Sequence, residues 1–300
     1  MEGVVNVLKP PGMTSSDVVT DVRHIFSMKR VGHTGTLDPG AAGVLPVCLG
    51  RATRLFDYLT DKEKEYFAEI RFGAETDTQD SYGTVVRRCG ARVSEAALGG
   101  ILPRFTGEQM QTVPLYAAVR VNGTPMYKLA RAGETVEQKE RRITVRALEL
   151  LRQTGDDSFL LRVVCSRGTY VRALCSDIGN ALGTFAHLSF LLRTRSGAFS
   201  VENAFTLEEL RALKEENLLS SAVLPVDEAL SGFPSLSLAG LSERERRLLL
   251  NGACVERGEE LCFGETVRTY LDGQFIGLGT RAEEGFHISV FFTTEGPDGE

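Results

Sequence analysis

The chain has 300 residues, of which 42% are hydrophobic and 25% charged, and its formal net charge is −6. This length is enough for a large core, so we expect one large and one small domain that fold without disulfides. No apolar stretch approaches the roughly 20 residues that a membrane span requires, so no membrane partner is expected. The six cysteines form no C-x-x-C pair and the four histidines are scattered, which argues against a zinc site and a disulfide framework. We expect reduced thiols and a cytoplasmic location.

The charge is unevenly distributed along the chain. Residues 201–300 carry 19 acidic and 8 basic side chains, whereas residues 1–200 carry 21 acidic and 26 basic ones. The basic excess is concentrated in residues 117–172, with eleven Lys and Arg against six Asp and Glu. Salt screens charges beyond roughly 8 Å, so such a local excess can follow nucleic-acid phosphates despite the negative total. A solvated basic face without a partner is an equal alternative.

The first elements read as a strand and a helix. Residues 4–8 form an apolar run that predicts a strand, and the turn Lys9-Pro10-Pro11-Gly12 follows it. Ser15 or Ser16 is a suitable cap for a helix. Its apolar stripe has helical spacing and consists of Val18, Val19, Val22, Ile25 and Phe26.

Asp38 lies in the segment Gly35-Thr36-Leu37-Asp38-Pro39-Gly40, which we consider the candidate active site. The glycines permit backbone angles that are closed to other residues, and Pro39 fixes its own φ and biases Asp38 toward an extended conformation. The carboxylate would therefore be presented on a defined loop. The same residues are also ordinary turn chemistry, so the segment alone does not establish a function.

Tyr66 begins an alternating segment. In residues 66–72 the positions of Tyr66, Ala68, Ile70 and Phe72 share one face, as in a strand with one buried side. A core tyrosine is the default interpretation at this position, and its hydroxyl would then need a partner.

Arg172 is in an unusual place for a cation. Residues 159–166 predict another strand, and Gly168 separates it from a helix whose apolar stripe is Val171, Leu174, Cys175, Ile178 and Leu182. Arg172 lies off this stripe, in the first helical turn. The partial positive charge of a helix N-terminus disfavours a cation by roughly 0.3–1 kcal/mol, so Arg172 requires a nearby carboxylate or phosphate.

The C-terminal third changes from helices to strands. Thr206 and Ser242 each begin a capping box, and the second helix is expected to end at Asn251-Gly252. The turn Asp272-Gly273 predicts a hairpin of residues 267–271 and 274–278, with a further strand at 287–292. We place a linker at residues 225–234, which gives domains 1–231 and 232–300.

Five sequence blocks carry a family resemblance. They occur in order at Leu8–Ser15, Gly32–Pro39, Leu45–Gly50, Thr76–Asp80 and Cys165–Arg172. Taken together, they resemble the TruB family of bacterial tRNA pseudouridine-55 synthases over nearly the whole chain. The resemblance implies an α+β fold with a mixed, largely antiparallel central sheet flanked by helices, followed by a small all-β PUA-like barrel that binds RNA.

The resemblance also implies roles for individual residues. Asp38 would be the catalytic aspartate, Tyr66 the aromatic group that packs on the target base, and Arg172 the ion-pair partner of Asp38. His33 would contact RNA beside the flipped nucleotide, and Leu191 would form an apolar wall of the base pocket. The further RNA-binding residues that it implies are Lys9, Asp80, Arg120 and Tyr170.

One block departs from the family pattern. The family usually has Pro-Pro-x-x-Ser-Ala-x-Lys where this chain has Val113-Pro114-Leu115-Tyr116-Ala117-Ala118-Val119-Arg120. Charge is kept at Arg120, but a guanidinium is a planar fork rather than a point charge. This change concerns the positioning of RNA rather than the chemistry.

The implied reaction breaks the bond between ribose C1′ and N1 of uridine, turns the base and joins C1′ to C5, without a metal or redox cofactor. A carboxylate can attack, stabilise a cationic sugar or remove a proton, and Arg172 would keep it ionised in a dry pocket. The expected partner is the T arm of tRNA, bound by a monomer without guide RNA. The alternatives are a non-catalytic RNA-binding protein or tRNA-folding chaperone, a glycosidase that releases uracil, and a guide-RNA-dependent relative.

Overall fold

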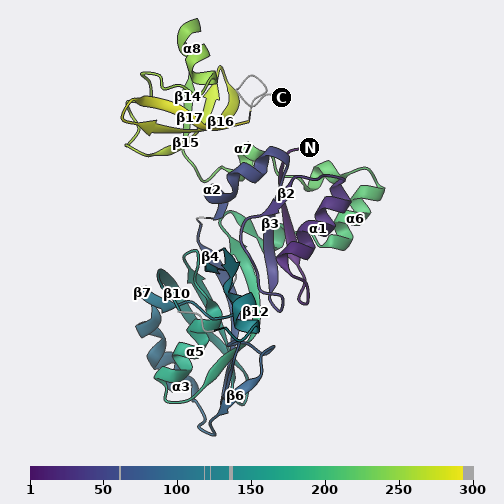
Figure 1. Cartoon of the computed structure of the whole chain (residues 1–300), viewed down its shortest axis with the longest axis vertical. Helices are drawn as coiled ribbons and strands as arrows, with labels where there is room; N and C mark the ends of the chain where they lie inside the picture. Colours follow the sequence, from purple (N-terminus) through teal and green to yellow (C-terminus); the bar gives the residue numbers. More distant parts are fainter. Residues whose placement is uncertain (61, 118, 122, 135–137, 293–300) are drawn as a thin grey trace.

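The computed structural model describes residues 1–60, 62–117, 119–121, 123–134 and 138–292, without the side chain of Arg120. The molecule is elongated, with a large sheet and its helices at one end and a small sheet at the other (Figure 1). No helix among these residues is both long and apolar enough to cross a membrane.

The large sheet is mixed and largely antiparallel, as expected. Among its strands in the described residues, β12 and β3 pair in parallel, and the short strands β2 (Val31–His33) and β13 (Phe199–Ser200) pair with β3 and β12 in antiparallel orientation. The main path runs through β1 (Gly3–Lys9), β3 (Ala42–Leu49), β12 (Ala186–Ser196), β4 (Lys64–Phe72), β11 (Ser158–Cys165), β10 (Glu140–Gly155) and β7 (Gly107–Thr112).

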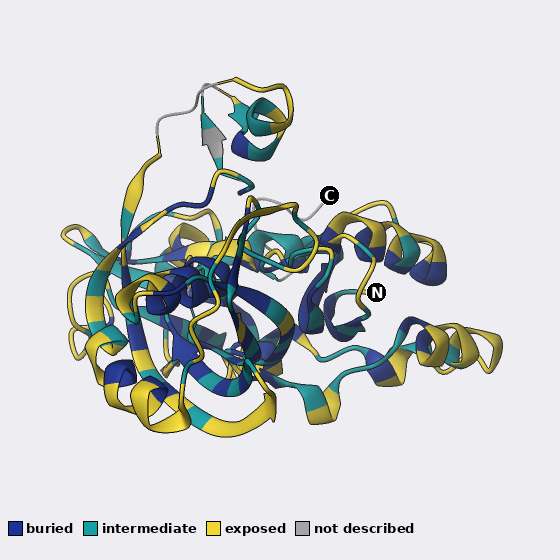
Figure 2. Ribbon diagram, turned by 90° about the horizontal axis from the view of Figure 1, so that it is seen from below, coloured by how far each residue is buried: buried dark blue, intermediate teal, exposed yellow. Residues whose placement is uncertain are grey.

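Two groups of helices cover this sheet. Helices α1 (Ser15–Phe26) and α6 (Leu207–Glu215) lie side by side and share a core with β1 and β3. Helices α3 (Glu95–Ile101) and α5 (Val171–Ala181) pack on β4, β10, β11 and β12. Figure 2 shows the buried residues concentrated along the central strands.

The cap of α1 differs from the expected one by one residue. Thr14, rather than Ser15 or Ser16, is the N-cap, because Thr14 and Asp17 exchange side-chain and backbone hydrogen bonds. The hydroxyl of Ser15 is therefore available to the Asp38 loop, where it accepts from the Leu37 amide at 2.9 Å and donates to the Leu37 carbonyl at 3.1 Å.

Short elements connect the layers. The remaining elements of this part are η1 (Gly50–Leu55), α2 (Phe56–Thr60), β5 (Ala74–Thr76), β6 (Val85–Arg88), η2 (Leu102–Phe105), β8 (Arg120–Val121), β9 (Thr124–Pro125), α4 (Met126–Arg131), η3 (Val201–Asn203), η4 (Leu219–Ala222) and α7 (Val226–Ala229).

The C-terminal sheet has four strands and one helix. The expected hairpin forms β15 (Thr266–Leu271) and β16 (Gln274–Ala282), between β14 (Ser235–Leu238) and β17 (Gly285–Phe291), and α8 (Glu243–Leu250) follows β14. Among the described residues the sheet is open, so the expected closed barrel is wrong in this respect. In the strand order, β14 and β17 are the two edges of this sheet, and Phe286 of β17 forms an isolated bridge with Val255.

The C-terminal sheet packs on the large one. Leu278 of β16 is fully buried in a cluster with Val4, Val44 and Leu230. Asp227 accepts hydrogen bonds from the Tyr270 hydroxyl at 2.6 Å and from Arg268 at 3.0 Å. The C-terminal sheet therefore shares a core with the large sheet and makes polar contacts with α7 (Val226–Ala229).

Candidate active site

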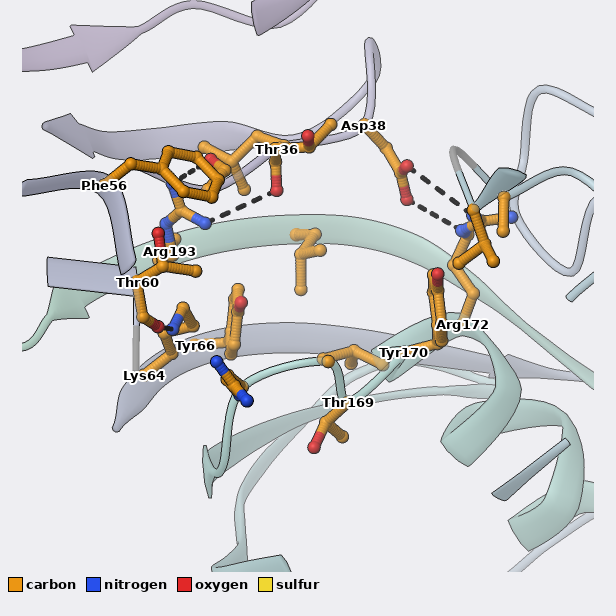
Figure 3. Close-up of a pocket in the computed structure, with 18 residues that line it drawn as sticks. Thr36, Asp38, Phe56, Thr60, Lys64, Tyr66, Thr169, Tyr170, Arg172 and Arg193 are labelled. Atoms are coloured by element: carbon orange, nitrogen blue, oxygen red, sulfur yellow. Dashed lines mark hydrogen bonds and ion pairs between the residues drawn. The ribbon is translucent and has the colours of Figure 1, made fainter. Parts of the chain in front are cut away.

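A pocket of about 360 Å³ opens where the Asp38 loop faces β4, β12 and the start of α5. Asp38 and Arg172 lie at one end of the pocket in Figure 3, and Tyr66, Lys64 and Arg193 lie at the other. The pocket therefore combines residues that are far apart in the sequence.

Arg172 is almost completely buried and faces Asp38. Its Nε lies 2.7 Å from Asp38 Oδ2, and its Nη2 donates to Asp38 Oδ1 at 3.5 Å (Figure 3). The closer approach lacks hydrogen-bond geometry at Nε, so it is an ion pair in which Nη2 supplies the hydrogen bond. The carboxylate is 38% exposed and Arg172 only 4%. A reactant in the pocket can thus reach the acid, while its cation stays sheltered.

Backbone carbonyls fix the Arg172 guanidinium. Nη1 donates to the Thr78 carbonyl at 2.8 Å, and Nη2 also donates to the Tyr116 carbonyl at 3.2 Å. Arg172, which was expected to lie near an anion, is thus held against Asp38 by the backbone carbonyls of Thr78 and Tyr116.

Tyr66 lies on the buried face of β4 and lines the pocket. Its strand neighbours are Val163 of β11 and Arg193 of β12. Burial raises the pKa of the Tyr66 hydroxyl to about 12, partly offset by the nearby Arg193 and a hydrogen bond with it. The hydroxyl is therefore neutral at physiological pH, and the ring offers an apolar surface to a bound group.

Two cations of the pocket, Arg193 and Lys64, were not identified from the sequence. Arg193 is 1% exposed and donates to three carbonyls, of Val44 at 2.7 Å, Gly35 at 3.1 Å and Thr36 at 3.5 Å. The Lys64 ammonium donates to the carbonyls of Thr60 and Lys62. The alternation of β4 could have identified Lys64, because this residue lies two positions before Tyr66 and therefore on the same inward face of the strand.

Lys9 is buried under the Asp38 loop. Its ammonium donates to the carbonyls of Pro10 at 2.8 Å, Pro39 at 3.2 Å and Ala41 at 2.7 Å. Burial lowers the pKa of Lys9 to about 8, although Asp38 acts in the opposite direction. The side chain has no exposed surface, so the structure gives it a supporting position rather than the expected RNA contact.

His33 and Asp80 flank the loop without lining the main pocket. His33 Nδ1 accepts from the Gly35 amide at 3.3 Å, and burial lowers the pKa of the ring, which favours its neutral form. Asp80 accepts from the Thr78 hydroxyl at 2.6 Å and lies 3.9 Å from Arg172 Nε.

Tyr170 and Leu191 both line the pocket. The Gln111 side-chain amide accepts from the Tyr170 backbone amide at 2.8 Å and donates to the Tyr170 carbonyl at 3.0 Å. Leu191 is buried on β12. Arg120 belongs to β8, but its side chain lies outside the described residues. Within the described ranges, no group of three or more His, Cys, Asp or Glu side chains could hold a metal ion.

Family models match most of the chain. Residues 23–171 match the TruB family pseudouridylate synthase N-terminal domain, and residues 172–231 match the tRNA pseudouridylate synthase B C-terminal domain. Asp38, Tyr66 and Arg172 all lie within these matches.

Relatives are similar over most of their length. The chain is 40% identical to tRNA pseudouridine synthase B of Alkaliphilus oremlandii, with 93% of each chain covered. It is 44% identical to that of Caldanaerobacter subterraneus subsp. tengcongensis, covering 95% of this chain and 96% of the relative. The relative from Pelotomaculum thermopropionicum is 48% identical over 79% of this chain and 76% of its own length.

Solved structures share the fold. A structure of an H/ACA RNP bound to a substrate RNA containing 2′-deoxyuridine has a TM-score of 0.73 at 26% identity, covering 99% of this chain and 88% of that chain. A Cbf5-Nop10-Gar1 complex has a TM-score of 0.71 at 28% identity, covering 97% and 84%. With the family models and the relatives, these similarities show that the chain belongs to the TruB family and is a pseudouridine synthase.

Proposed function

We propose that this pseudouridine synthase acts on tRNA and isomerises uridine 55 in the T arm, with Asp38 as the catalytic carboxylate. The observation that carries the proposal is the half-exposed Asp38 carboxylate, paired with the buried Arg172 in a pocket lined by Tyr66 and Leu191. The names of the relatives supply the substrate class, since each is a tRNA pseudouridine synthase B.

The pocket provides what an isomerisation of a nucleoside requires. Asp38 acts on the ribose or its C1′–N1 bond, either by attack at C1′, by stabilising a cationic sugar or by removing a proton. Arg172 balances the charge of the carboxylate and orients it without itself occupying the space of the substrate. The base must then rotate and bond through C5, which loses its hydrogen to solvent as a proton, while N1 takes up a proton in its place.

The walls of the pocket hold the free base during this rotation. Taking a nucleotide out of its stack costs a few kcal/mol, which contacts in the pocket recover. The Tyr66 ring offers a stacking surface, and Leu191 closes the pocket from β12. The same enclosure distinguishes an isomerase from a glycosidase, which would release uracil.

The chain is proposed to act alone, as a monomer in the cytoplasm, without guide RNA. The basic side chains of residues 117–172 would follow the phosphates of the T arm. The reaction involves no net change in oxidation state, so it needs no redox cofactor, and we propose that it proceeds without a metal or an organic cofactor.

The experiment is a single-turnover reaction of the purified chain with a tRNA transcript that carries tritium at C5 of uridine. The wild type should release tritium and form pseudouridine at position 55 only, and a transcript with cytidine at this position should be inert. Asp38→Asn should be inactive, and the exposed Asp57→Asn on α2 serves as a matched control with full activity. Binding without product would favour the RNA chaperone, free uracil the glycosidase, and activity only with added guide RNA the guide-dependent relative.

A further inference from the structure

A second, smaller hollow adjoins the pocket on the far side of Asp38. It has a volume of about 20 Å³, and it shares Asp38, Arg172 and Leu191 with the main pocket. Its outer rim is formed by Tyr82 and Phe190. The ion pair therefore lies between two hollows, and only one of them is needed for the target base.

The two aromatic side chains on this rim are exposed. Tyr82 is 73% exposed and Phe190 is 47% exposed. Such rings gain little from burial in the folded chain, and exposed apolar groups beside a pocket typically mark a binding site. Their contribution to stability does not explain why aromatic side chains stand here.

The Tyr82 ring is held in place although it is exposed. It lies directly on Gly40, where an added Cβ would overlap the ring. The Tyr82 amide donates to Asp80 Oδ1 at 3.0 Å. The adjacent Ser81 amide donates to the carbonyl of Leu188 on β12 at 3.0 Å, and Leu188 returns a hydrogen bond to Gln79. This turn is thus fastened to the strand that carries Phe190 and Leu191.

We propose that Tyr82, with Phe190 beside it, is a stacking platform for a base that directly neighbours the target uridine. This inference rests on the proposed function. When the target leaves its stack, each neighbouring base loses a stacked partner, and an aromatic ring next to the pocket replaces it. Stacking of a base on an aromatic ring tolerates any base, because every base has a π face. The platform therefore contributes to RNA affinity and positioning and leaves the chemistry to Asp38.

The test is a binding cycle between the residue and the base. Stem-loops of the T arm carry either the normal sequence or an abasic site directly 5′ or directly 3′ of the target. Proteins carry Tyr82→Ala, Tyr82→Phe or neither change, each in the Asp38→Asn background so that the RNA is not converted. Val86→Ala, an exposed position on the same hairpin, is the matched control. Dissociation constants are measured by fluorescence anisotropy, and thermal unfolding checks the fold of each variant.

Tyr82→Ala should weaken binding of the normal stem-loop by about tenfold, whereas Tyr82→Phe and Val86→Ala should bind like the parent. At one of the two flanking positions, an abasic site should weaken binding to the parent protein by the same factor. Tyr82→Ala combined with this abasic site should weaken binding little more than either change alone. In the presence of Asp38, Tyr82→Ala should keep its single-turnover rate at saturating RNA within about twofold.

Additive losses at both flanking positions, or equal affinity of Tyr82→Ala and Tyr82→Phe, would overturn the platform. The cycle measures binding, so it decides this point whether or not the wild type forms pseudouridine. Absence of product from the wild type would instead overturn the proposed function.

Discussion

Asp38 and Arg172 show how two residues that are 134 positions apart become one functional unit. The sequence supplied independent reasons for each: a presented carboxylate on a glycine-bounded loop, and a cation where a helix N-terminus disfavours it. The structure places Arg172 Nε 2.7 Å from Asp38 Oδ2, so the carboxylate is the anion that Arg172 requires. Arg193 was not found because its burial depends on β12 lying against β3 and β4, which is a tertiary property that local patterns do not contain.

The pair should behave as a unit in mutagenesis. Asp38→Asn keeps the volume of the side chain but removes its charge, so the single-turnover rate should fall by at least ~10³ with little change in binding. Arg172→Ala should also abolish most of the rate, and Arg172→Lys should recover only part of it because it lacks the planar fork. The double variant should be no slower than Asp38→Asn. Single-turnover rates on a tRNA transcript measure these effects. If the fold-losses of the two single variants multiplied in the double variant, the two residues would act independently.

Lys9 predicts a pH dependence of stability. Its pKa is lowered by burial from 10.5 to about 8 in the folded chain. Between pH 8 and 10.5 the unfolded chain therefore holds a proton that the folded chain has released, so this residue makes the free energy of unfolding rise with pH. Below pH 8 both states are protonated and the contribution is constant.

Lys9→Met lacks this titration but keeps an unbranched side chain of similar length. The stability advantage of the wild type over Lys9→Met should grow between pH 7.5 and 9.5, by at most about 2 kcal/mol. Urea unfolding of both proteins at the two pH values measures it, and other titrating groups cancel in the difference. A pH-independent difference would mean that the three carbonyls hold Lys9 protonated throughout.

At the scale of elements, the sequence predicted several of the regular segments but not which strands pair with one another. Apolar alternation located β4, the segment of residues 159–166 was predicted as the strand that is β11, and the turn Asp272-Gly273 located the hairpin of β15 and β16. Both capping boxes, at Thr206 and Ser242, are confirmed. β12 was not predicted, because its buried face includes Arg193 and Ser196 and its opposite face exposes Phe190, so polarity does not follow the strand alternation.

The contact between β3 and β12 depends on one glycine. Gly43 has φ +120°, and a Cβ at this position would overlap the backbone of its strand partner Arg193. Gly43→Ala should therefore force the two strands apart and lower the free energy of unfolding by roughly 2 kcal/mol or more. Gly99→Ala is the matched control, since Gly99 lies in α3 with open space around it. There alanine should stabilise by up to ~1 kcal/mol, and similar urea midpoints for both variants would refute the argument.

At the scale of the molecule, the division into residues 1–231 and 232–300 remains a proposal with a defined test. All the catalytic candidates precede residue 232, and the C-terminal part is acidic. A chain ending at Ser231 should retain its single-turnover rate at saturating RNA within about tenfold, but should bind RNA more weakly. It should also unfold at a lower temperature, because Leu278 leaves the core that it shares with Val4 and Leu230.

Leu278→Ala in the full chain separates these effects. It removes part of the shared core and keeps the C-terminal sheet, so the unfolding temperature should fall while RNA affinity stays unchanged. A folded truncated chain without any single-turnover rate would show that the C-terminal part contributes to the chemistry.

The position of β12 has a consequence for how the enzyme is made. This strand, residues 186–196, lies between β3 and β4 in the sheet, although both of these strands are synthesised much earlier. Until β12 has left the ribosome, no strand lies between β3, which follows the Asp38 loop, and β4, which carries Tyr66. We therefore expect a nascent chain that contains every family motif up to Arg172 to be still inactive, with the pocket assembled only after β12 has joined the large sheet.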